Sequence, residues 1–89
     1  MANLKLQQTQ DEVRQKAIKA YQEYMASQAA LQLARELVTL RIEAEKAAVL
    51  PADKFKAAKD RMTAEVDEVK ADLAQRFAYV KLMSLVGKQ

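Results

Sequence analysis

The sequence predicts an all-α fold, a long antiparallel two-helix coiled-coil hairpin that turns near Val49–Asp53. The first observation is a shortage of turn residues, because Gly87 and Pro51 are the single glycine and the single proline among 89 residues. The second is composition, since 17 residues are alanine, the best helix former, and alanine buries little area in a compact core. The third is a heptad spacing of apolar residues in both halves of the chain.

The first helix is expected over about residues 3–48, a segment without glycine or proline. Its apolar positions alternate four and three residues apart, which is typical of a coiled-coil seam. The members of this first seam are Val13, Ala17, Ala20, Tyr24, Ser27, Leu31, Ala34 and Val38. A second stripe runs beside it, formed by Ala30, Leu33, Leu37, Leu40, Ala44 and Ala47. One partner helix covers one seam, so the second stripe indicates a further neighbour in this chain or another.

The start of this helix is polar and extends beyond the reach of the second helix. We therefore expect the first dozen residues to fray unless another chain holds them. Somewhat later, Tyr21, Tyr24 and Met25 form an apolar patch that we interpret as helix packing.

The turn is expected at residues 49–52, where Val49-Leu50-Pro51 interrupts the pattern. A residue before proline avoids the α region, so the first helix should end by Leu50. Pro51 suits the first position of a new helix, and Asp53 in the first turn interacts well with the helix dipole. A proline kink within one continuous helix is the alternative.

The second helix is expected over about residues 52–86, with Gly87 as its stop. Its main seam contains Phe55, Ala58, Met62, Val66, Val69, Leu73, Phe77, Val80 and Met83. Beside it runs a mostly alanine stripe with one residue every seven, formed by Ala57, Ala64, Ala71, Ala78 and Leu85. A stripe of alanines allows two helix backbones to approach closely, and we interpret it as a tight helix pair.

The composition argues against catalysis and cofactor binding. No histidine or cysteine is present, which excludes thiol chemistry, disulfides and most zinc sites. The single glycine excludes a phosphate-binding loop, so we expect no catalytic, cofactor or metal site. Glu65, Glu68 and Asp72 share one helix face, which we interpret as a solvated acidic surface. No apolar segment approaches the roughly 20 residues that span a membrane, and residues 1–10 do not resemble a signal peptide.

A basic cluster follows the turn, formed by Lys54, Lys56, Lys59 and Arg61. It could contact phosphates, but the formal charge is a mild +3 and no aromatic platform accompanies it. Nucleic-acid binding is therefore the least favoured function. The apolar tip is more informative, because Val49 and Leu50 stand where polar residues are expected. They are either a partner-docking point or a plug that closes the end of the coiled coil.

The sequence also resembles one family, the TolC-type outer membrane efflux proteins, over about residues 12–87. The resemblance lies in Ala34-Arg35-Glu36-Leu37, Ala48-Val49-Leu50, Phe55-Lys56-Ala57-Ala58, and Tyr79-Val80-Lys81-Leu82-Met83 through Gly87. Two positions depart from the family pattern. Ala48 stands where a tip glycine is usual, and Lys54 stands where an aspartate is common, with Asp53 one place off.

The resemblance implies the periplasmic helical hairpin of such a channel, packed side by side with other helices. It implies a periplasmic adaptor protein as the partner of the tip, here Ala48, Val49, Leu50, Pro51 and Asp53. A free-standing coiled-coil module is the alternative, such as a phage, scaffold or regulatory protein that binds a partner helix or itself. The channel arm would be periplasmic, and the free-standing module cytoplasmic.

Overall fold

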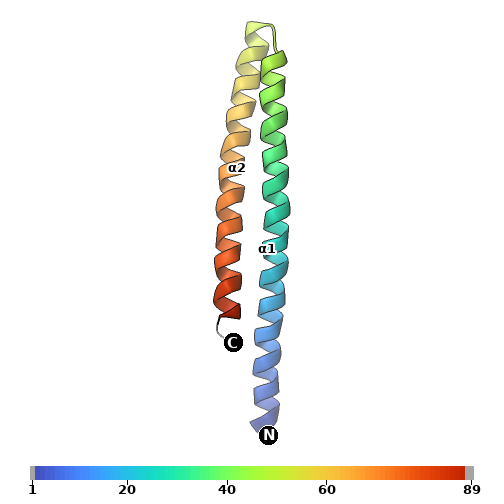
Figure 1. The fold of residues 1–89 in the computed structure, drawn as a ribbon, viewed down its shortest axis with the longest axis vertical. Coiled ribbons are helices and arrows are strands. Elements are labelled where there is room, and N and C mark those ends of the chain that lie inside the picture. The colour runs from blue at the N-terminus through green and yellow to red at the C-terminus, as the bar shows by residue number, and fades with distance from the viewer. Residues whose placement is uncertain (1, 88–89) are drawn as a thin grey trace.

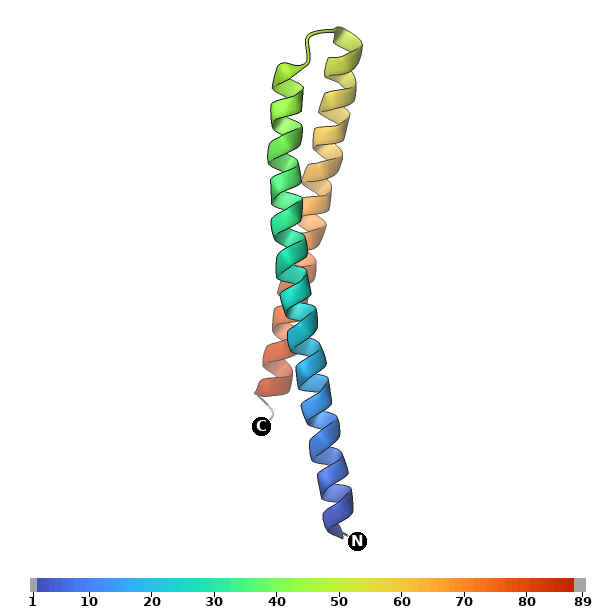
Figure 2. The same ribbon diagram turned by 90° about the vertical axis from the view of Figure 1, so that its right-hand side faces the viewer.

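The computed structural model describes the backbone of residues 2–87 and the side chains of residues 6–87. Two α-helices make up the described chain, α1 (Ala2–Ala47) and α2 (Pro51–Val86). They run antiparallel and side by side from the turn, and α1 continues well past the C-terminal end of α2 (Figures 1 and 2). The molecule is a rod with extents of 74 × 15 × 14 Å. The predicted all-α hairpin is confirmed.

The turn is short because Pro51 restricts the residue before it to an extended conformation and itself starts the next helix. The Ala48 N–H donates to the Ala44 carbonyl at 3.1 Å and closes the last turn of α1. Leu50 is extended, with φ −77° and ψ 143°, as expected for a residue before proline. Pro51 then begins α2, and the Lys54 N–H donates to the Leu50 carbonyl at 2.9 Å. A kinked continuous helix is therefore excluded, and α2 begins one residue before the predicted Ala52.

The end of α2 is where it was predicted. α2 ends at Val86, and the Gly87 N–H donates to the Met83 carbonyl at 2.8 Å. Gly87 keeps a right-handed φ of −67°, so it follows the helix without the left-handed conformation that glycine permits. α1 begins at Ala2 and ends at Ala47, each one residue before the predicted bounds of about 3–48. The fraying expected for its first dozen residues stays a prediction.

The first seam of α1 faces α2, as predicted. Ala20 and Leu31 are 1% and 6% exposed, and Tyr24 and Val38 are half-buried. Tyr24 packs against Tyr79 of α2, with ring centroids 5.8 Å apart and a tilt of 52°. Val13, at the start of the seam, is more exposed because it lies beside Leu82 and Val86, near the end of the overlap with α2.

On α2 the alanine stripe makes the contact with α1. Ala64 is 3% exposed, and Ala57, Ala71, Ala78 and Leu85 are half-buried. The predicted tight helix pair is thus seen, with small side chains between the two backbones. Leu82, at 7% exposed, is the one large apolar side chain buried on the described part of α2.

The main seam predicted on α2 does not face α1, and this is a correction. Its eight large members are between 43% and 75% exposed: Phe55, Met62, Val66, Val69, Leu73, Phe77, Val80 and Met83. The physical reason is the geometry of one narrow contact. Residues of this seam lie about half a turn around α2 from the alanine stripe, so both sets cannot face α1 together. The alanine stripe faces α1, and ion pairs between the two helices flank this contact.

Candidate functional site

The largest candidate surface is the side of α2 that points away from α1. We call it the outer stripe and define it by its heptad positions: Phe55, Lys59, Met62, Val66, Val69, Leu73, Arg76, Val80 and Met83. Seven of these nine positions carry large apolar side chains, and all seven are exposed. A long, mostly apolar exposed stripe of this kind on a rod is typical of a helix-binding site.

The second stripe predicted on α1 is also uncovered by α2. Leu33 and Leu40 are 66% and 60% exposed, and Leu37 is 38% exposed. Leu33 and Leu37 each precede a first-seam position by one residue, so the stripe flanks the α1–α2 contact. The hairpin thus presents apolar surface on both helices, which agrees with the expectation that one partner helix covers one seam.

Polar residues between the helices are engaged in ion pairs that span the hairpin. The Arg61 guanidinium donates to Glu45 of α1 and, at 3.0 Å, to Glu65 of its own helix. The hydrogen bonds that Arg61 donates to these two carboxylates, the one to Glu65 first, raise the pKa of Arg61 above its ordinary value. Near the open end, the Lys81 ammonium lies 3.1 Å from Glu23 of α1. These pairs fix which side of α2 faces α1.

The predicted basic cluster is divided by this arrangement. Arg61 points toward Glu45, whereas Lys54, Lys56 and Lys59 are exposed. Four cations therefore do not form one phosphate-binding surface.

The three acidic residues predicted to share one face of α2 are each paired with an arginine. Glu65 contacts Arg61 at 3.0 Å, Asp72 contacts Arg76 at 3.1 Å, and Glu68 lies 3.9 Å from Arg35. Within the part of the chain that the structure describes, no group of three or more carboxylates gathers in a metal-binding arrangement. The acidic face therefore balances local positive charge.

The predicted docking residues at the tip are open to solvent. Val49 is 80% exposed and Leu50 is 63% exposed, so they do not plug the end of the coiled coil. Pro51 and Asp53 are also exposed, and Ala48 is half-buried. Because Leu50 is held extended by Pro51, the tip displays these two apolar side chains in a fixed backbone.

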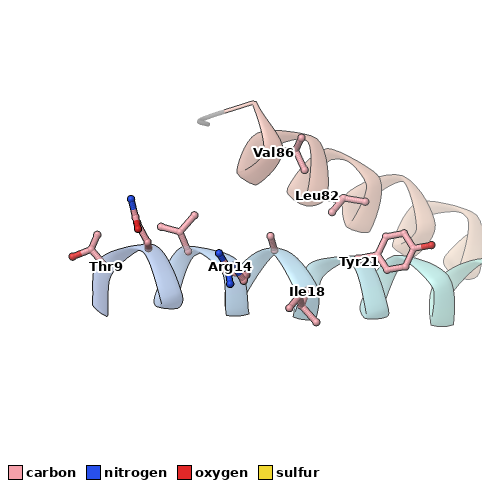
Figure 3. Close-up of a pocket in the computed structure, with 9 residues that line it drawn as sticks. Thr9, Arg14, Ile18, Tyr21, Leu82 and Val86 are labelled. Atoms are coloured by element: carbon pink, nitrogen blue, oxygen red, sulfur yellow. The ribbon is translucent and has the colours of Figure 1, made fainter. Parts of the chain in front are cut away.

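At the opposite end, a shallow groove of about 730 Å³ forms where α1 runs beyond α2. Leu82 and Val86 project from α2 toward α1 above it, and Thr9 and Arg14 lie on the continuing part of α1 (Figure 3). The aromatic patch predicted nearby is split. Tyr24 packs on Tyr79, whereas Tyr21 is 54% exposed.

The chain as a whole leaves much surface uncovered for its mass. It exposes 7272 Å², whereas a compact monomer of 10.0 kDa exposes about 5,200 Å². The excess of about 2,000 Å² is larger than the roughly 800 Å² that one partner buries in a standard protein–protein interface. Neither described helix is long and apolar enough to cross a membrane.

No protein-family model matches the chain, and neither curated proteins nor solved structures give a significant match.

Proposed function

We propose that this chain is a non-enzymatic structural hairpin that packs beside other helices through its uncovered stripes and docks a partner through its tip. One observation carries the proposal. The apolar stripes of α1 and α2 remain exposed although the two helices are fully paired along α2. Burial of such stripes against further helices stabilises an assembly by roughly 25 cal/mol per Å² of apolar area.

The periplasmic arm of a TolC-type efflux channel is the specific form that we propose. In such a tube each helix has neighbours on two sides, which suits a hairpin with apolar surface on both helices. The partner of the tip would then be a periplasmic adaptor protein, in contact with Val49 and Leu50. A free-standing coiled-coil module is the alternative form, and the same stripes support it.

Site-specific photo-crosslinking tests the tip. A photoreactive residue at Leu50 is expected to give one defined adduct in cells, and mass spectrometry would identify an adaptor-type helical protein. The matched control places the same residue at Leu6, which is 59% exposed and lies at the other end of the rod. Equal adducts from both positions, or none from Leu50, would contradict tip docking. For the channel form, the flanking gene sequence should encode a signal peptide and the membrane portion of an efflux protein.

A further inference from the structure

The outer stripe of α2 has an internal symmetry that points to its occupant. We propose that it binds the outer stripe of a second copy of this chain, with the two hairpins parallel and their tips at the same end. This inference goes beyond the proposed function, which requires only that some helix covers the stripe. The resulting order of helices is α1–α2–α2–α1, so the pairing of α1 with α2 within each copy is unchanged.

The spacing of the stripe is that of a two-stranded coiled coil. Its positions alternate four and three residues apart from Phe55 to Met83 without a break. Val66, Leu73 and Val80 occupy one of the two core positions, and Met62, Val69 and Met83 occupy the other. Branched side chains at the first position, here Val66 and Val80, are the choice found in parallel two-stranded coiled coils, whereas Leu73 and Val69 have the reverse placement.

The charges beside the stripe match a parallel pair of identical helices. Glu65 and Lys70 lie on opposite borders of the outer stripe and are five residues apart. In a parallel pair, a residue on one border faces the residue five positions later on the opposite border of the neighbour. Glu65 of each copy then meets Lys70 of the other, which gives two equivalent ion pairs. One Glu65 oxygen accepts from Arg61, and the second oxygen can accept from this lysine.

An antiparallel pair of the same stripes has the opposite electrostatics. With Val69 at the two-fold axis, Glu65 lies beside Asp72 of the other copy, and the two Lys70 side chains face one another. Like charges at both borders disfavour this orientation. The charge pattern is thus complementary to itself in one orientation, which is the reason to assign a second copy in place of an unrelated helix.

Two polar residues interrupt the stripe, Lys59 and Arg76. A single lysine at a core position is tolerated in coiled coils and helps to fix the register. Arg76 already pairs with Asp72, and its long side chain can lie along the apolar surface with its charge in water. Lys59 and Arg76 therefore lower the affinity of the dimer and restrict the alignment of the two copies.

Mass in solution tests the dimer. Sedimentation equilibrium of the full chain is expected to give twice the 10.0 kDa monomer mass at high concentration and dissociation on dilution. Val66→Lys/Leu73→Lys should give a helical monomer, because both positions are exposed within one hairpin. The matched control, Leu33→Lys/Leu40→Lys on α1, should remain dimeric. A monomeric wild type, or loss of the dimer in the control alone, would overturn the proposal.

Charge exchange tests the border contacts without altering the apolar core. Lys70→Glu should raise the dimer dissociation constant roughly tenfold, since attraction becomes repulsion at two symmetric sites. Lys70→Gln should have a smaller effect than Lys70→Glu, since it removes the attraction without adding repulsion. An affinity unchanged by Lys70→Glu would contradict the proposed pairing.

Single cysteines test the orientation, because the natural chain has none. Met83→Cys should crosslink to itself readily, since parallel stripes bring equivalent residues together. In an antiparallel dimer, Met83→Cys would instead crosslink to Phe55→Cys of the other copy, and this result would overturn the proposal. If the chain does not dimerise, the crosslink from Leu50 to a partner protein is still expected. Failure of the dimer proposal can therefore be distinguished from failure of the proposed function.

Discussion

The inner and outer faces of α2 use opposite solutions to helix pairing. The inner face contacts α1 through alanines, with Ala64 almost fully buried, and through the charged Arg61. The outer face carries most of the large apolar side chains of the helix, and these remain exposed. The difference teaches that the largest apolar stripe of a helix does not identify its neighbour within the chain.

Close approach explains the inner face. Small side chains let two backbones come together along many turns, and interhelical ion pairs add specificity to the contact. The outer face contributes little to the hairpin, so its large side chains are available for another helix. Loss of a side chain should therefore have very different effects on the two faces.

The largest expected effect compares two leucines on the same helix. Leu82→Ala should lower the free energy of unfolding by about 2–3 kcal/mol, because Leu82 is buried on the inner face. Leu73→Ala should change it by less than about 0.5 kcal/mol, since Leu73 is half exposed on the outer stripe. Urea denaturation of dilute, monomeric protein measures both. Equal losses would show that the two faces do not differ.

Overpacking of the alanine stripe should have the next largest effect. Ala64→Leu and Ala71→Leu should each cost about 1–3 kcal/mol, because the close helix contact has no room for larger side chains. Ala74→Leu is the matched control on the same helix, since Ala74 is exposed. Thermal unfolding compares the three variants. Unchanged or higher stability of Ala64→Leu would mean that this stripe faces solvent.

The smallest effect concerns the ion pair at the open end. A double-mutant cycle on Glu23 and Lys81 should give a coupling energy of about 0.2–1 kcal/mol, because both side chains are partly exposed. The coupling should weaken in high salt, which screens exposed charges. A coupling of zero at low salt would remove this pair from the contacts that fix the α2 face.

Much of the fold could be predicted from simple signals. Pro51 and the absence of other helix breakers gave two helices and their turn. The first seam of α1 was identified correctly because Leu31 and its neighbours follow a regular heptad. The apolar tip beside Pro51 was also identified, but the choice between an open docking point and a plug came only with the exposure of Val49 and Leu50.

The face of α2 could not be chosen by the same means. Its large apolar residues form the stronger heptad pattern. Such a pattern predicts that a helix face is buried, but it does not say whether the covering helix belongs to this chain or to another. The inner positions include Arg61 and Glu68, which do not look like contact residues in a sequence. Their ion pairs with Glu45 and Arg35 become apparent only when the register between the helices is known.

Disulfide formation within one chain tests the central claim, that the alanine face of α2 pairs with α1, most directly. Arg35 and Glu68 are level across the hairpin, which places Ala34 beside the inner face near Ala71. Ala34→Cys/Ala71→Cys should form an intramolecular disulfide under mild oxidation in dilute solution. Ala34→Cys/Val69→Cys should not, because Val69 lies on the outer stripe. A bridge in the second variant but not in the first would contradict the account.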